Sequence, residues 1–275
     1  MDPIVQAFVM GIVQGLTEFL PISSSGHLIV VPYLFGWDDT FIKSLAFSVA
    51  LHAGTLAALL IYFREDWLRL VPAGFAAIRD RSFRGEPDRR LAWLIVVATV
   101  PAAIAGVILN DPIEKAIRQP GLVAIMMVLG AAILWVADHW GSRSKSEDKL
   151  SMPAAFGIGA AQALALVPGV SRSGISISAA LFAGLTRADA ARFSFLMATP
   201  ITALAVAYEA YKLVKGEAGV PIEVAPLVVG VITAFVFGLL AIAGLLRYVR
   251  TRSFNIFVAY RLVVAAIVLA AFLVR

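Results

Sequence analysis

The chain is 275 residues long, 60% of them hydrophobic and 15% charged, with a formal net charge of +5 at pH 7. A soluble domain is nearer half apolar and carries about a quarter charged residues, so this composition excludes a soluble enzyme. The chain has no cysteine, which excludes disulfides, thiolate nucleophiles and Cys-ligated metal centres.

The first apolar segment, residues 4–20, ends in the polar stretch 21–27, whose sequence is PISSSGH. Only about ten apolar residues follow it, whereas a membrane-spanning helix needs about 20. We therefore predict a re-entrant hairpin, in which two short helices meet at a polar break that protein or a water-filled cavity surrounds. An ordinary pair of tilted spans with a surface loop is the alternative.

Six later segments are apolar and long enough to be full spans. In chain order they cover residues 41–63, 91–110, 121–137, 193–208, 224–246 and 255–274. Residues 153–167 run into a second break at 168–174, and a short apolar piece ends near Gly184. We expect a second re-entrant hairpin there. The whole chain, residues 1–275, is predicted to be one all-α polytopic membrane domain with six full transmembrane helices and two re-entrant helical hairpins.

The two hairpins are related to each other in sequence. At an offset of 148 residues, the following positions are identical: Gly11, Gln14, Leu16, Ser23, Ser25 and Gly26 match Gly159, Gln162, Leu164, Ser171, Ser173 and Gly174. This indicates an internal repeat with copies at approximately 4–63 and 152–211. Three full spans separate the two hairpins, so the second copy is expected to be inverted in the membrane, with a site where the broken helices meet.

The basic residues predict an orientation. Four connections expected on one side of the membrane hold 15 of the 23 Lys and Arg residues, which makes that side cytoplasmic. Both termini then face outward, and the first hairpin enters the membrane from outside. Lys43 is the first basic residue and Asp2 is acidic, so we expect no signal peptide. The positive charge is an orientation signal, and no nucleic acid is expected as a partner.

Polar residues inside the apolar layer are costly and mark candidate sites. The charged or titratable ones are Glu18, His27, His52, Arg172 and Arg261. Gln14 precedes Glu18 by four residues, so both side chains lie on one helical face. If the repeats face each other, this face meets the break that contains Arg172.

This set of groups suits a phosphate ester or anhydride. Arg172 offers a planar fork for phosphate oxygens, and helices that start after each break direct their dipoles inward. Further donors come from hydroxyls and glycine amides, at Ser23, Ser25, Gly26, Ser171, Ser173, Gly174 and Ser176. Glu18 can hold a divalent cation or accept a proton. His27 or a neighbouring hydroxyl such as that of Ser24 is the nucleophile, or His27 protonates the leaving group.

Structural roles are the competing interpretation. Glu18 can simply neutralise Arg172 or Arg261, and Arg261 itself is balanced between such pairing and substrate contact. His52 is interpreted as a hydrogen-bonded support.

Two longer stretches that contain the breaks, QGLTEFLPISSSGH at 14–27 and PGVSRSGIS at 168–176, resemble the two signature motifs of the undecaprenyl-diphosphate phosphatase family, also called the BacA-type bacitracin-resistance family. The resemblance covers the whole chain. It implies a multi-pass enzyme of the bacterial inner membrane that removes the terminal phosphate of undecaprenyl diphosphate. That reaction recycles the lipid carrier for peptidoglycan synthesis, with Mg²⁺ or Ca²⁺ as cofactor. The resemblance also implies a site that opens toward the periplasm.

By this resemblance, the acidic motif falls on Gln14 and Glu18. Glu18 supplies the only carboxylate of this pair and is the expected ligand of the metal ion. The Ser and His of the first motif fall on Ser24 and His27, and the arginine motif on Ser171, Arg172 and Ser173. Gln14 departs from the family's frequent Glu, and Ser176 stands where the family commonly has Thr.

The rival function is a transporter or flippase for a polyprenyl phosphate, because inverted repeats with broken helices are typical of transporters. The expected partners are a polyprenyl diphosphate and membrane lipids, and association into a homo-oligomer stays open.

Overall fold

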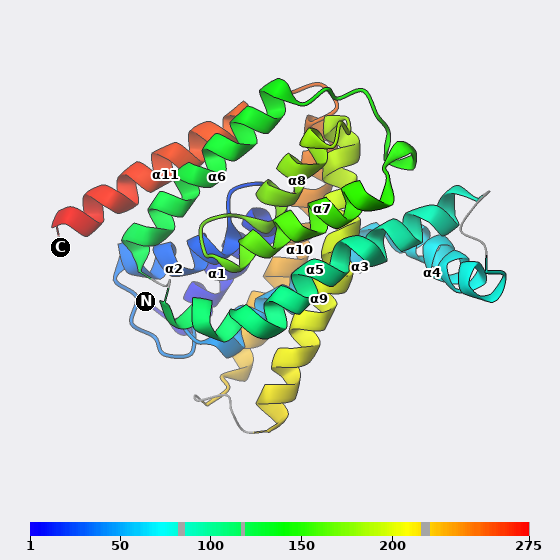
Figure 1. Cartoon of the computed structure of the whole chain (residues 1–275). Coiled ribbons are helices and arrows are strands. Elements are labelled where there is room, and N and C mark those ends of the chain that lie inside the picture. The colour runs from blue at the N-terminus through cyan, green and yellow to red at the C-terminus, as the bar shows by residue number, and fades with distance from the viewer. Residues whose placement is uncertain (82–85, 117–118, 216–220, 275) are drawn as a thin grey trace.

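The computed structural model of the chain describes residues 1–81, 86–116, 119–215 and 221–274 (Figure 1). In these ranges the regular secondary structure is helical, with one isolated parallel bridge between Lys145 and Leu185. The helices are α1 (Pro3–Phe19), α2 (Ser24–Phe35), α3 (Leu45–Tyr62), α4 (Arg64–Arg79), α5 (Pro87–Ala116), α6 (Pro120–Trp140), η1 (Glu147–Lys149), α7 (Met152–Gln162), η2 (Ala163–Leu166), α8 (Arg172–Phe182), α9 (Arg187–Val214), α10 (Val224–Tyr248) and α11 (Asn255–Val274). The predicted all-α polytopic class is confirmed.

Five helices of the described chain are long and apolar enough to cross a membrane, namely α5, α6, α9, α10 and α11. The remaining predicted span, residues 41–63, is shorter than expected because α3 starts only after Ser44, whose hydroxyl accepts from the Phe47 amide at 3.1 Å. Helices α3 and α4 are long and apolar enough to cross a membrane only when they are taken together, and the chain bends by 81° between them. The described helices thus give five spans, or six if the bent pair counts as one.

Helix α4 lies between the predicted spans 41–63 and 91–110, in one of the basic connections expected on the cytoplasmic side. Its first turn contains Glu65 and Asp66, which suit the positive end of a helix dipole. Leu70 and Ala77 are buried, and α4 packs on α5. The helix therefore forms because a neighbouring helix covers one of its faces, which local charge patterning could not reveal.

Small residues bring the short helices close to long ones. A Cβ atom on Gly11 of α1 would lie 2.7 Å from the carbonyl oxygen of Gly230 in α10, and one on Gly159 of α7 would lie 1.9 Å from that of Ala98 in α5. Glycine at such positions lets two backbones approach each other, as is common in membrane helices. Gly11 and Gly159 are matched in the predicted repeat, so the two matched helices make the same kind of contact.

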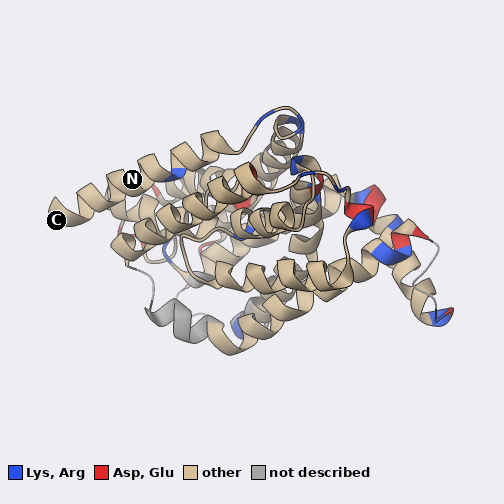
Figure 2. Cartoon of the chain, turned by 45° about the horizontal axis from the view of Figure 1, so that its top comes forward, with Lys and Arg blue, Asp and Glu red and all other residues tan. Residues whose placement is uncertain are grey.

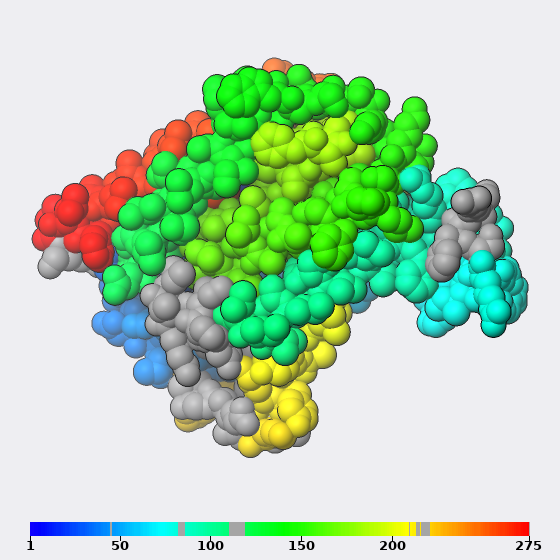
Figure 3. All heavy atoms as spheres, in the orientation of Figure 1, coloured from blue at the N-terminus to red at the C-terminus, as the bar shows by residue number. Residues whose placement is uncertain are grey.

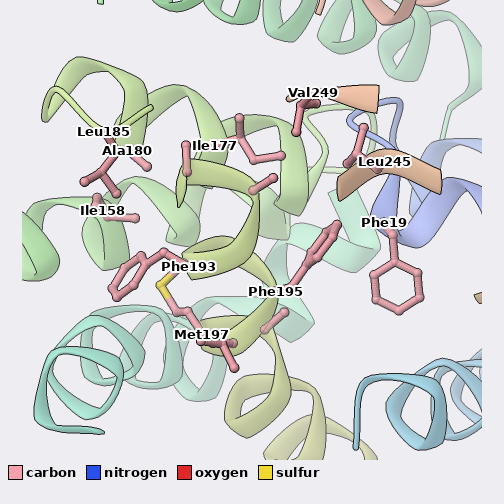
Figure 4. Close-up of a cluster of buried hydrophobic side chains, with 14 of the residues drawn as sticks. Phe19, Ile158, Ile177, Ala180, Leu185, Phe193, Phe195, Met197, Leu245 and Val249 are labelled. Carbon is pink, nitrogen blue, oxygen red and sulfur yellow. The ribbon is translucent and has the colours of Figure 1, made fainter. Parts of the chain in front are cut away.

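The largest hydrophobic cluster supports the helices that carry the second break. It contains Ile177 of α8 and Phe193 and Phe195 of α9, together with Phe19 at the end of α1 and Leu245 of α10 (Figure 4). Helices α7 and α8 lie between α5 and α6 on the face shown in Figure 3. The second break is thus surrounded by packed helices and does not lie in a peripheral loop.

Charge is concentrated at one end of the molecule. Lys, Arg, Asp and Glu gather over α4, the start of α5 and the connection from α6 to α7, whereas most of the remaining ribbon is free of charged residues (Figure 2). Both termini lie at the opposite side in this view. The separation of a charged end from an apolar body is what a protein inserted in a bilayer requires.

Candidate active site

Each polar break contains a serine with a rare backbone conformation. Ser23 has φ 77° and Ser171 has φ 76°, values that side chains other than glycine seldom adopt. The Ser23 hydroxyl accepts from the Gly26 amide at the start of α2, and the Ser171 hydroxyl accepts from the Gly174 amide at the start of α8. These matched serines therefore cap α2 and α8 in the same way.

The two breaks are in direct contact. The Gly169 amide donates to Ser23 Oγ at 3.1 Å, and Ser173 Oγ donates to the Leu20 carbonyl at 3.0 Å. Segments separated by almost 150 residues in the sequence thus share hydrogen bonds, as expected for two facing hairpins. Ser25 contributes a contact of 3.4 Å between its hydroxyl and that of Ser23.

Glu18 lies where these segments converge and is 5% exposed. Its Oε1 atom accepts from Arg172, and its Oε2 atom accepts from Ser24 Oγ and, at 3.0 Å, from Gln14 Nε2. The Nε2 atom of His52 lies 3.6 Å from Oε2. One carboxylate thus connects α1, α2, α3 and α8, and it sits beside a cation and a hydroxyl.

Arg172 reaches from the start of α8 to Glu18 and to α9. Its Nη1 atom donates to the Ala198 carbonyl at 3.2 Å and to the hydroxyl of Thr202. The sequence interpretation missed these two α9 groups, because a backbone carbonyl and a single Thr in an apolar span give no distinctive signal. Their contacts fix the guanidinium over the break, with one edge toward Glu18.

His27 is held by the residues around it, and within the described part of the chain it forms no hydrogen bond with Glu18 or Arg172. Its Nδ1 atom lies 2.7 Å from the Ser23 carbonyl, which can only accept, so Nδ1 carries the proton. Its Nε2 atom then accepts from the Tyr260 hydroxyl at 2.9 Å, and the two rings stack. Tyr260 is a partner that the sequence did not predict.

The other predicted residues fall into two groups. Ser171 and Ser173 stay at the break, with their hydroxyl oxygens 3.3 Å apart. Ser176 is fully buried, and its hydroxyl bonds the Arg172 carbonyl at 2.7 Å and Ser194 Oγ of α9 at 2.6 Å. This places Ser176 between α8 and α9, beside the backbone that carries Arg172.

The site has oxygen atoms suited to a hard cation, but few of them. In the described part of the chain, no group of three or more His, Cys, Asp and Glu residues is placed to hold a metal. Beside the Glu18 carboxylate, however, Gln14 Oε1 is buried without a hydrogen-bond partner. Mg²⁺ commonly uses one or two carboxylates together with substrate phosphates and water. The residues therefore fit a cation that binds together with a phosphorylated ligand.

Comparison with known proteins gives a consistent result along the whole chain. The profile of the family described as "Bacitracin resistance protein BacA" matches residues 7–267. Undecaprenyl-diphosphatase of Desulforudis audaxviator is 44% identical over 275 residues, which is all of both chains. The proteins of that name from Geobacter sulfurreducens and Moorella thermoacetica are 46% and 42% identical, each over 99% of both chains.

Proposed function

Because this chain belongs to the bacitracin resistance protein BacA family, we propose that it hydrolyses undecaprenyl diphosphate to undecaprenyl phosphate and inorganic phosphate. This reaction recycles the lipid carrier for peptidoglycan and other cell-wall polymers, and it confers bacitracin resistance. The observation that carries the proposal is the contact of Glu18 with both Arg172 and Ser24 at the meeting point of the two breaks. A cation, a carboxylate and a hydroxyl are thereby placed together.

The diphosphate binds to Arg172 and to donors at the starts of α2 and α8. A guanidinium bonds phosphate oxygens through two parallel N–H groups, and helix N-termini favour anions. In the described structure Arg172 pairs with Glu18, so the incoming phosphate takes over part of the guanidinium and leaves Glu18 Oε1 free. Four further hydroxyls lie where the two breaks meet, those of Ser23, Ser25, Ser171 and Ser173.

Ser24 is the proposed nucleophile. Its hydroxyl already donates to Glu18, so Glu18 can take the proton as Ser24 Oγ bonds to the terminal phosphorus. The bond from that phosphorus to the bridging oxygen breaks, and undecaprenyl phosphate leaves with the electron pair. Water then attacks the phosphorus, the bond from phosphorus to Ser24 Oγ breaks, Glu18 returns the proton to Ser24, and inorganic phosphate leaves with both protons of the water. Both ring nitrogens of His27 have other partners, so His27 is assigned the support of the Ser23 turn.

A divalent cation, Mg²⁺ or Ca²⁺, completes the proposed site. Glu18 and the free Gln14 Oε1 would hold it together with oxygens of the substrate. When bound, it offsets phosphate charge and so lowers the barrier to nucleophilic attack. Arg172 stabilises the charge on the phosphoryl group that is transferred.

We further propose that the two short-helix pairs are re-entrant hairpins of an inverted repeat, with copies at 4–63 and 152–211. The matched Ser23 and Ser171 turns and the matched Gly11 and Gly159 contacts support this. The charged end lies in the cytoplasm, and the site opens to the periplasm, where both termini lie. The prenyl tail stays in the lipid.

The activity is tested with purified protein and undecaprenyl diphosphate. We expect phosphate release that a chelator abolishes and that added Mg²⁺ or Ca²⁺ restores. Undecaprenyl monophosphate, which lacks the anhydride bond, is the matched substrate control and should release no phosphate. Absence of release from the diphosphate at any divalent ion concentration would refute the enzymatic assignment and favour a lipid transporter.

A further inference from the structure

Arg261 of α11 is a fully buried arginine whose partners are main-chain carbonyls. Across the described residues its guanidinium donates to five of them, those of Pro21, Met126, Met127, Gly169 and Val170. None of its hydrogen bonds in this part of the chain reaches a carboxylate. Arg261 is therefore neither the structural partner of Glu18 nor exposed for substrate contact, which were the two alternatives for it.

Two of these carbonyls occupy the same position in the two copies of the repeat. Pro21 and Gly169 are 148 residues apart, the offset that also relates Ser23 to Ser171. Arg261 Nη1 donates to the Pro21 carbonyl at 3.3 Å, and Nη2 donates to the Gly169 carbonyl at 2.8 Å. A single side chain thus bonds both breaks, each two residues before the serine that caps the next helix.

Glycines in neighbouring helices leave the space that this guanidinium occupies. A Cβ on Gly130 of α6 would lie 2.0 Å from Arg261 Nη2, and one on Gly174 of α8 would lie 3.0 Å from Nη1. The Cβ on Gly130 would also lie 2.8 Å from the Val170 carbonyl oxygen, so any larger residue there would displace the guanidinium together with a carbonyl that it bonds. The planar fork fits this position through several N–H groups in fixed directions, which the single ammonium of Lys cannot reproduce.

We propose that Arg261 is a positioning residue for phosphoryl transfer: by bonding the backbone of both breaks, it fixes Ser24 and Glu18 of one copy relative to Arg172 of the other. The inference deepens the proposed function and rests on it. Arg261 acts through the Pro21, Gly169 and Val170 carbonyls, because the turns at Ser23 and Ser171 follow them directly. It touches neither substrate nor metal.

Kinetics with two variants test the proposal. Arg261→Lys keeps the charge but loses the fork, and Gly130→Ala keeps the arginine but displaces it. A misplacement of about 1 Å can cost about a hundredfold in rate, so we expect kcat to fall at least about tenfold in both while KM changes less than about threefold. Gly244→Ala is the matched control, because a Cβ on Gly244 of α10 would meet no atom within 4 Å, and it should keep wild-type kinetics.

A distance measurement reports on the breaks without any activity. The chain has no cysteine, so spin labels on Phe35→Cys at the end of α2 and Phe182→Cys at the end of α8 are unambiguous. Both native side chains are exposed, at 68% and 54%. We expect one narrow distance distribution that broadens or shifts in Arg261→Lys and Gly130→Ala but not in Gly244→Ala.

Three results would overturn the positioning role. Wild-type kcat in Arg261→Lys would show that only the charge matters. A rise in KM with unchanged kcat would make Arg261 a substrate contact. An unchanged label distance in an inactive variant would show that the loss of activity does not come from a displacement of the two breaks. If the parent protein releases no phosphate at all, the function fails, whereas the label distances still decide whether Arg261 fixes the breaks. If Arg261→Lys does not fold, Gly130→Ala decides both measurements.

Discussion

Glu18 and Arg172 form an ion pair between α1 and α8, across the contact of two helix breaks that lie far apart in the sequence. The Glu18 carboxylate is almost completely buried, so the pair is costly to form and removal of either partner leaves an uncompensated charge. An anionic ligand that can replace the carboxylate at the guanidinium meets a cation already in place. The pair is therefore well suited to exchange with a phosphate group.

Replacement of Arg172 should be far more damaging than replacement of Ser176. Arg172→Gln removes the group that stabilises the transferred phosphoryl, and loss of one such donor costs about 10²–10³ in rate. Ser176→Ala removes hydrogen bonds to the Arg172 carbonyl and Ser194, so we expect a loss of less than about tenfold, in line with the small net energy of a hydrogen bond. Phosphate release at saturating substrate measures both, and equal losses would contradict the distinction.

The proposed nucleophile Ser24 can be tested against its neighbour Ser25, which serves as the matched control. Ser24→Ala should lower kcat by about 10³ or more, because loss of a nucleophile leaves only binding and electrostatic catalysis. Ser25→Ala should keep kcat within about tenfold. The Ser25 hydroxyl contacts that of Ser23 at 3.4 Å, so the substitution removes one weak hydrogen bond at most. If Ser24→Ala stays active while His27→Gln is inactive, the nucleophile is His27.

Much of the site could be predicted from the sequence because its polar residues interrupt apolar segments. Glu18, Ser24 and Arg172 stand out there, and they do lie together. His52 was interpreted only as a support. Its Nδ1 atom does bond the Ser48 carbonyl, but its Nε2 atom points to Glu18, a contact that depends on how α3 packs against α1.

The partners that sequence patterns could not supply come from tertiary packing. The Ala198 carbonyl, Thr202 and Tyr260 belong to full spans with no polar break, and nothing in their spacing links them to Arg172 or His27. The same holds for α4, whose stability comes from packing on α5. Periodicity and composition describe one segment at a time, whereas these contacts depend on which segments become neighbours.

Stability at the charged end should depend on pH through Glu147. Burial raises the pKa of the Glu147 carboxyl from 4.5 to about 7, and the nearby Arg192 offsets this only in part. Because the folded pKa lies above the unfolded value, the favourable contribution is complete below about pH 4.5 and is lost as pH rises through about 7. Glu147→Gln mimics the neutral form, so its Tm should exceed that of wild type at pH 8 and match it at pH 4, below the unfolded pKa.

The exposed carboxylate of Glu65 provides the control for this measurement. Its side chain is 81% exposed, so Glu65→Gln should leave Tm unchanged at both pH values, as surface pairs contribute little. A Glu147→Gln variant whose Tm lies below that of wild type at pH 8 would show that the ion pair of Glu147 with Arg192, rather than the cost of burying its charge, dominates.

The proposed orientation is tested by reporters at the C-terminus. The basic end of the molecule should face the cytoplasm, so alkaline phosphatase, which is active only in the periplasm, should be active when fused after residue 275. Green fluorescent protein at the same point should stay dark after Sec-dependent export. Fluorescence together with an inactive phosphatase would reverse the orientation and place the site on the cytoplasmic side.

The most direct test of the central claim is phosphate release from undecaprenyl diphosphate by wild type, Glu18→Gln and the control Glu65→Gln. The amide of Glu18→Gln keeps the shape and burial of the side chain but can neither take the Ser24 proton nor offer a charged oxygen to a cation. We predict that Glu65→Gln matches wild type and that Glu18→Gln loses about 10²–10⁴ in kcat, the range of general-base catalysis. A folded Glu18→Gln protein that releases phosphate at the wild-type rate would contradict the account.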